Sequence, residues 1–341
     1  MLTDRAASFF FLVSLFLSTL LSAQSEQDKP TQANTARPSQ SGDVQQGDTL
    51  GITQTPATVP LIPPKEHSVL GELEIITINS KVLRNIRNLR VWLPANYFAP
   101  VNRNKHYPVL YMQDGQNLFD EATAFNHEWK FDETVEFLTG SMRIGPMIVV
   151  GIDNTPRRAN EYLPYPDPEN KELGKPETQD VHGKQYGDFV IQEVMPLIQK
   201  KYRVALGPQN TGLGGSAYGG AVTLYTVLMH AGVFGKALIE SPSLLIGNGQ
   251  LLKDADKATQ FPQRMYLAIG TAEESDEKAA AKDADAVRDL EKILRDKGLG
   301  PNRLKVVVEE GAKHDETAWS KRLLGALQFL YGGDIHLIPA K

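Results

Sequence analysis

The chain contains no cysteine among its 341 residues. Disulfides, thiolate catalysis and cysteine-ligated metal sites are therefore excluded, and so is a lipid anchor on an N-terminal cysteine. It also lacks a basic excess, because its net charge is -5 at pH 7. We therefore expect no nucleic-acid partner, since such proteins present a basic face. Its length, with 41% hydrophobic and 23% charged residues, suits one large globular domain with additional segments.

Long apolar runs are scarce, and the one at the N-terminus spans Phe9 to Leu21. A membrane-spanning helix needs about 20 apolar residues, more than this run offers. Arg5 precedes the run and Ala23 follows it, a pattern typical of a secretory signal peptide over residues 1–23. The sequence thus predicts a periplasmic or extracellular (secreted) protein without a stable membrane span after cleavage. An uncleaved anchor is the alternative.

Residues 24–64 are rich in Gln, Thr, Ser and Pro and nearly free of aromatic residues. Such a segment buries too little apolar surface to offset the entropy lost on ordering, so it is interpreted as a disordered tether. Residues 65–335 are expected to form a single domain, followed by a short tail over 336–341.

Within that domain, short apolar stretches alternate with segments of helical periodicity. Strand-like stretches occur at 73–78, 89–93, 108–112, 147–150, 211–214, 237–239, 266–269 and 306–308, and helical faces occur at 186–197, 222–228, 287–294 and 319–330. The first two strands suit an antiparallel hairpin. The alternation predicts an α/β fold whose mostly parallel sheet has helices on both faces.

The stretch Gly215-Ser216-Ala217-Tyr218-Gly219 has the outline of a G-x-S-x-G nucleophile elbow, a tight strand-to-helix turn. Side chains at its glycine positions would crowd the strained central residue. Alanine stands where the nucleophilic serine belongs, and a methyl group cannot attack a carbonyl. Ser216 precedes the apex of the turn, so we expect its side chain to point away from the site and to bond within the turn.

In α/β-hydrolases the serine is followed along the chain by an acid and then by a histidine. His314 lies between the last strand and the last helix, where this fold presents its general base. Glu273 follows the strand that ends at Gly270, so its carboxylate is the candidate that orients the imidazole. The neighbouring acids Glu274 and Asp276 also suit a helix start, where the macrodipole favours negative charge.

An oxyanion hole needs two backbone N–H groups, one of them from the residue after the nucleophile. Tyr218 occupies that position, and Gln116, in the loop after the strand at 108–112, is the candidate for the second. An ordinary Asp-Gly turn is the alternative for this loop.

Three further residues are candidates for substrate binding. Arg158 and Tyr162 lie in a stretch over 155–185 that is rich in Pro and charged residues, and Trp129 lies upstream. A solvated loop and a core tryptophan are the alternatives. No metal-ligand spacing is evident, so we expect neither a metal nor a cofactor.

Several motifs together resemble the "putative esterase" family of α/β-hydrolases, which includes enterochelin-type esterases, feruloyl and acetyl-xylan esterases, S-formylglutathione hydrolases and mycolyl transferases. The resemblance spans roughly residues 70–331 and is carried by 110–120, 150–154, Arg158 with Glu161-Tyr162, Tyr202-Arg203 and 240–243. It implies an α/β-hydrolase fold, a small-molecule or carbohydrate ester as substrate, and a triad on Ala217, Glu273 and His314.

The resulting hypothesis is an exported serine carboxylic-ester hydrolase whose nucleophile is replaced by Ala217, so that the chain is inactive as written. A pseudoenzyme that binds an ester or carbohydrate ligand is one alternative, and a cell-envelope interaction module carried on the tether is another. The sequence specifies neither the acyl and alcohol parts of a substrate nor the oligomeric state.

Overall fold

The computed structural model describes residues 65–166 and 180–333, all of which lie in one compact unit, Leu61–Lys341. Several sequence predictions fall on residues outside the described ranges: the signal peptide over 1–23, the tether over 24–64 and the tail over 336–341. Residues 167–179, which belong to the Pro-rich and charged stretch over 155–185, also lie outside them. Among the residues described, no helix combines the length and the apolar character that crossing a membrane requires.

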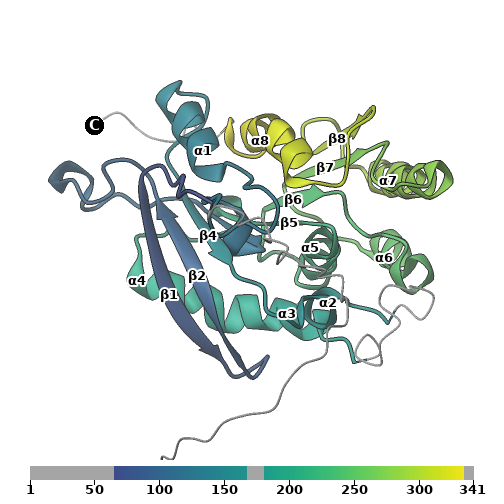
Figure 1. The fold of residues 1–341 in the computed structure, drawn as a ribbon, viewed down its shortest axis with the longest axis horizontal. Coiled ribbons are helices and arrows are strands. Elements are labelled where there is room, and N and C mark those ends of the chain that lie inside the picture. Colours follow the sequence, from purple (N-terminus) through teal and green to yellow (C-terminus); the bar gives the residue numbers. More distant parts are fainter. Residues whose placement is uncertain (1–64, 167–179, 334–341) are drawn as a thin grey trace, which may run out of the picture. The chain divides into compact units, whose positions relative to one another are not determined.

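A single eight-stranded sheet forms the centre of this unit, in the order β1-β2-β4-β3-β5-β6-β7-β8 (Figure 1). β1 (Glu72–Ser80) and β2 (Asn85–Leu93) form the expected antiparallel hairpin, and β2 also pairs antiparallel with β4. All other pairs are parallel. The remaining strands are β3 (Val109–Gln113), β4 (Ile148–Ile152), β5 (Thr211–Ser216), β6 (Lys236–Glu240), β7 (Arg264–Gly270) and β8 (Leu304–Glu309).

Helices cover both faces of the sheet, as predicted. α1 and α8 share one apolar layer, while α3, α5, α6 and α7 pack in the other. The helices are α1 (Phe131–Gly140), α2 (Arg158–Tyr162), α3 (Gly183–Phe189), α4 (Met195–Lys201), α5 (Tyr218–Met229), α6 (Ile246–Lys257), α7 (Glu277–Asp296) and α8 (Glu316–Tyr331).

Strand β3 shows how the two layers are built. Its residues are all buried, and they alternate: Leu110 and Met112 belong to the layer of α1 and α8, whereas Val109 and Tyr111 belong to the other layer. A strand with helices on both sides needs apolar residues at every position. The continuous apolar run in the sequence follows from that requirement.

The helical face predicted over 186–197 is divided into three pieces. A π-helical turn, η4 (Val190–Val194), separates α3 from α4, and Pro196, which has no N–H to donate, lies in the first turn of α4. Glu193 in this turn accepts hydrogen bonds from Ser80 Oγ at 2.5 Å and from Lys81 N at 2.8 Å. The irregular turn therefore fastens the tip of the β1–β2 hairpin.

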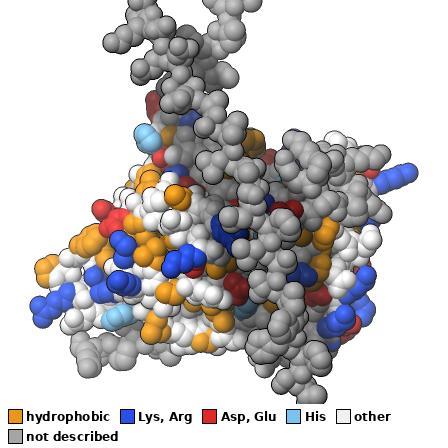
Figure 2. Space-filling model, turned by 90° about the horizontal axis from the view of Figure 1, so that it is seen from below, with side chains coloured by type: hydrophobic (Ala, Val, Ile, Leu, Met, Phe, Trp, Pro, Cys, Tyr) orange, Lys and Arg blue, Asp and Glu red, His pale blue; other side chains and the backbone are white. Residues whose placement is uncertain are grey.

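On the part of the chain that the structure describes, Figure 2 shows one face where basic, acidic and apolar side chains are interspersed. The parallel strands place their carboxyl ends along one edge of the sheet, where sites of this architecture are built. The loops after β3, β5, β7 and β8 carry Gln116, Ala217, Glu273 and His314 to that edge.

Candidate active site

Ala217 joins β5 to α5 in a conformation that L-residues rarely adopt, with φ 53° and ψ -120°. Its N–H donates to the Glu240 carbonyl at 3.1 Å, and its carbonyl accepts from Ser243 N at 3.3 Å. Such a backbone costs on the order of 1–3 kcal/mol and persists only where its surroundings impose it. The turn therefore keeps the strained geometry of an elbow although its apex carries only a methyl group.

The glycines around the apex are required by close packing. A Cβ at Gly215 would lie 2.7 Å from the carbonyl carbon of Gly219, and one at Gly220 would lie 2.9 Å from the Glu240 carbonyl oxygen. Real Cβ atoms essentially never come so close to backbone. The turn therefore has no room for a Cβ at Gly215 or Gly220, although the atoms that such a Cβ would meet belong to Gly219 and Glu240 rather than to the central residue.

Ser216 is the last residue of β5 and exposes only 4% of its surface. The residue lies in the sheet, paired in register with Glu240 of β6. A nucleophile must meet its substrate at a surface, so this burial favours a structural role for Ser216.

His314 and Glu273 meet at the edge of the sheet. His314 Nδ1 lies 2.5 Å from Glu273 Oε2, an arrangement in which Nδ1–H donates to the carboxylate and Nε2 is left for another partner. The Glu273 side chain is 3% exposed and the His314 side chain is 35% exposed. The acid therefore lies beneath the imidazole, and the imidazole faces solvent.

The Glu273 carboxylate is held by more than the histidine. Its Oε1 accepts hydrogen bonds from Ser241 Oγ at 2.5 Å and from Gly270 N at 2.7 Å. Burial alone would raise the pKa of Glu273, but the bonds from His314, Ser241 and Gly270 outweigh it and lower that pKa below its usual value. Glu273 is consequently a carboxylate at neutral pH.

Ser241 and Trp319 form a layer behind this pair that the sequence analysis did not identify. Trp319 Nε1 donates to Ser241 Oγ at 2.9 Å, and the Trp319 ring lies 5.2 Å from the His314 ring in an edge-on arrangement. Ser241 has φ 42°, a second strained position close to the elbow. The signal available in the sequence was the stretch Glu240-Ser241-Pro242-Ser243, but its bonds to Glu273 cannot be read from it.

A buried ion-pair network fixes α8, the helix that follows His314. Arg322 donates from Nε to Glu240 Oε2 at 3.0 Å and from Nη1 to Glu309 Oε2 at 2.8 Å. Burial raises the pKa of Glu240 to about 7 even though the Arg322 charge lowers it. These bonds tie α8 to the ends of β6 and β8, and so they fix the loop that carries His314.

The loop after β3, which carries Gln116, is pressed against the end of β4. Asp114 has φ 58°, and a Cβ at Gly115 would lie 2.5 Å from the Gly151 carbonyl carbon. Gln116 lies in a 3₁₀ turn, η2 (Gly115–Asn117), and its Oε1 accepts from Asn154 N at 3.1 Å. Tyr218 is the first residue of α5, where N–H groups have no intrahelical acceptor.

Arg158 is held by the same loop. Its Nε and Nη2 donate to the two Asp114 oxygens at 2.7 Å and 2.8 Å, and its guanidinium lies over the rings of Tyr162 and Tyr218. A bidentate pair of this kind fixes orientation as well as charge. Arg158 therefore links α2, the loop after β3 and the first residue after the elbow, and its side chain remains 30% exposed.

Tyr162 and Trp129, the other two candidates for substrate contact, both lie in the interior, which for Trp129 is the alternative of a core tryptophan. Tyr162 is 0% exposed, and its hydroxyl accepts from Asp114 N at 3.3 Å. Trp129 is 3% exposed and stacks on Phe131, with Trp319 at 5.3 Å on its ring. Their apolar bodies pack in the core, so in this conformation they support the loops rather than face a ligand.

Residues 80–330 match the model of the family described as Putative esterase. The uncharacterized protein YbbA of Bacillus subtilis (strain 168) is 24% identical over 251 residues, covering 72% of this chain and 93% of that protein. An endo-1,4-beta-xylanase/feruloyl esterase of Xylanibacter ruminicola is 22% identical over 265 residues, which are 76% of this chain but only 31% of that protein.

Solved structures that share this fold include the following two. The BES protein from Bacillus cereus has a TM-score of 0.61 at 20% identity, covering 78% of this chain and 98% of that one. The enterobactin esterase FES from Shigella flexneri, solved in the presence of enterobactin, has a TM-score of 0.56 at 19% identity, covering 78% and 60%. At such identities the likeness shows the fold.

Proposed function

The chain belongs to the Putative esterase family, and from that premise we propose that it carries the site of a serine carboxylic-ester hydrolase with alanine at the nucleophile position. One observation carries the proposal: Ala217 retains the strained φ of 53° and ψ of -120° at a strand-to-helix turn. The Glu273–His314 hydrogen bond at the same edge of the sheet supports it.

Each remaining group has a role in acyl transfer. A serine oxygen at position 217 would attack the ester carbonyl, and His314 Nε2 would take its proton, while Glu273 would stabilise the imidazolium. The N–H groups of Gln116 and Tyr218 are proposed to face the developing oxyanion. Ala217 supplies no oxygen, so no acyl-enzyme bond forms and the chain is inactive as it stands.

The substrate is proposed to be a small-molecule or carbohydrate ester met outside the cytoplasm. The proposal of export rests on residues 1–23 of the sequence alone. One structural neighbour is named a ferulic acid esterase and another an enterobactin esterase, and the first of these names makes feruloyl esters the first class to test. Arg158 is the candidate ligand contact, because part of its side chain reaches solvent beside the elbow.

The test is Ala217→Ser, assayed beside the unmodified chain on nitrophenyl, feruloyl and acetyl-sugar esters. Removal of a triad nucleophile costs on the order of 10⁶ in rate, about 8 kcal/mol of barrier. We expect the serine variant to hydrolyse at least one class and the further change His314→Ala to abolish this. Ser216→Ala is the matched control and should leave the rate unchanged. Ordinary turnover by the unmodified chain, lost in Ser216→Ala, would show that Ser216 is the nucleophile.

A ligand-binding pseudoenzyme is the second candidate, and one observation favours it. The elbow strain and the Glu273 hydrogen bonds persist although no oxygen is present to use them. Under this alternative the unmodified chain binds an ester saturably, and Ala217→Ser folds and binds the same ester but hydrolyses nothing. Calorimetric titration with the esters of the assay panel separates the two candidates.

A further inference from the structure

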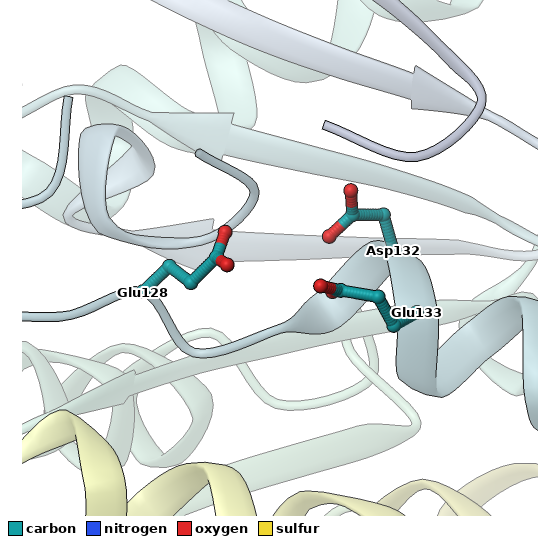
Figure 3. Close-up of side chains that lie close together, drawn as sticks. All are labelled: Glu128, Asp132 and Glu133. Carbon is teal, nitrogen blue, oxygen red and sulfur yellow. The ribbon is translucent and has the colours of Figure 1, made fainter. Parts of the chain in front are cut away.

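Three carboxylates converge at the start of α1, away from the Glu273–His314 pair. Glu128 comes from the loop before the helix, and Asp132 and Glu133 lie in its first turn (Figure 3). One oxygen of each lies within 4.8 Å of those of the other two. Glu128 and Asp132 are buried, and Glu133 is half-buried. The close-up shows the Glu128 and Glu133 carboxylates pointing toward each other, with that of Asp132 beside them.

The described residues supply few hydrogen-bond donors or cations to these three carboxylates. Glu128 Oε2 accepts from Ser68 Oγ at 2.9 Å, and Asp132 Oδ2 accepts from Leu70 N at 2.6 Å. Asp132 Oδ1 and Glu133 Oε2 are buried, and no N–H or O–H group from outside the cluster donates to either of them among the residues that the structure describes. Among the described residues, neither a lysine nor an arginine forms an ion pair with any of the three. A buried charge without a partner is costly, so the two orphaned oxygens point to a missing cation.

We propose that Glu128, Asp132 and Glu133 bind one calcium ion. Calcium–oxygen distances are about 2.3–2.6 Å, so ligand oxygens on opposite sides of the ion lie up to roughly 5 Å apart. The three carboxylate oxygens lie within 4.8 Å of one another, which fits that span. Only oxygen ligands are present, which selects a hard cation over zinc or copper. Magnesium is less suited, because it demands near-ideal octahedral geometry and the cluster is irregular.

Water completes the shell. A cavity of about 500 Å³ lies beside the cluster and is lined in part by Ser68, Glu128 and Lys130. Calcium is coordinated by about six to eight oxygen atoms, so several coordination positions would remain for water once the three carboxylates are bound. The bound ion would tie the segment before β1 to the loop and first turn of α1. Trp129, next to Glu128, packs on Trp319, so the same ion would steady the layer behind His314.

Without a cation, the cluster has a second way to relieve its repulsion. Burial, reinforced by the neighbouring Glu133, raises the pKa of Asp132 to about 8, so this carboxyl can hold a proton at neutral pH. A shared proton and a bound ion are mutually exclusive at the same oxygens. They differ in their response to calcium, and that difference can be measured in the unmodified chain.

The experiment begins with protein freed of metal by a chelator. Calcium chloride is titrated by calorimetry, terbium luminescence sensitised by tryptophan is followed, and melting is recorded with and without calcium. We expect one saturable site with a dissociation constant on the order of 10⁻⁴ M and a Tm rise of roughly 5 °C at about 10 mM calcium. Asp132→Asn should weaken binding at least tenfold and remove the Tm rise. Glu136→Gln, an acid of the same helix outside the cluster, should change neither.

The chelated proteins give a further readout. Asp132→Asn should melt no lower than the unmodified chain in chelator, because the amide carries no charge that a missing cation would leave unbalanced and keeps an oxygen to accept from Leu70 N. If Asp132→Asn does not fold, Glu133→Gln takes its place. Absence of saturable calcium and terbium binding to the unmodified chain, with identical melting in chelator and calcium, would overturn the proposal in favour of the shared proton. Binding that survives unchanged in both variants would overturn the assigned ligands.

Discussion

The strain at Ala217 has a measurable consequence for stability. With φ 53° and ψ -120°, this alanine stores on the order of 1–3 kcal/mol that glycine does not incur. Against this, glycine loses more chain entropy on folding, about 0.4–1 kcal/mol. Removal of a partly buried methyl group costs at most about 0.8 kcal/mol. With the middle of each range, the balance for Ala217→Gly is a gain of about 0.5 kcal/mol, which for a domain of this size raises the Tm by about 1–2 °C.

The assay is thermal unfolding of Ala217→Gly beside Ala281→Gly. Ala281 is an exposed position inside α7, where glycine costs about 1 kcal/mol relative to alanine. The same substitution should therefore shift the Tm in opposite directions at the two sites. Equal destabilisation at both would refute the reasoning, because it would mean that position 217 is relaxed in the folded protein.

Three further outcomes test the surroundings of the elbow. Glu273→Gln should lower the Tm at pH 7, and the difference should close in acid, because a carboxylate whose pKa is lowered on folding loses its contribution as pH falls through that pKa; melting scans across pH check this. Gly115→Ala should destabilise by roughly 3 kcal/mol in urea unfolding, since its Cβ would lie 2.5 Å from backbone carbon of β4. Arg158→Lys in the Ala217→Ser background should lower kcat/KM by about tenfold or more, because lysine cannot hold both Asp114 oxygens; an unchanged value would show that the Arg158–Asp114 pair does not position the loop after β3 for catalysis.

The fold was largely predictable from the spacing of apolar residues. That spacing shows which side of a helix or strand is buried, and the buried sides are those that face the layers of helices and sheet. The hairpin, the parallel strands and the helices on both faces are confirmed, with bounds extended by a few residues, as in β2, which begins at Asn85 rather than Leu89. The π-helical turn at Val190–Val194 was missed, since the apolar face of a helix continues through it. The place of β4 between β2 and β3 was not predicted either, because pairing partners are not encoded in local pattern.

The meeting of Glu273 and His314 was predictable from their order along the chain, whereas their catalytic roles stay a prediction. Glu273 and His314 follow known strands, and the structure brings them within hydrogen-bond distance. What could not be read is which distant side chains meet. The bond from Ser241 to Glu273 joins residues 32 positions apart, and that from Trp319 to Ser241 joins residues 78 apart. Tyr162 was a candidate for substrate binding because it is an aromatic residue close to Arg158 in the sequence. An aromatic ring packs equally well in a core, and Tyr162 is buried there.

The ring stack beneath the imidazole places a natural fluorophore at the candidate site. Trp319 lies edge-on to His314 at 5.2 Å and donates to Ser241 Oγ, which in turn donates to Glu273. Trp129, whose ring lies 5.3 Å from that of Trp319, belongs to the same stack. Indole emission responds to changes in its surroundings, so a ligand that binds beside His314 should alter the intrinsic fluorescence of the protein. Such a signal needs no turnover, so it can follow binding to the unmodified chain.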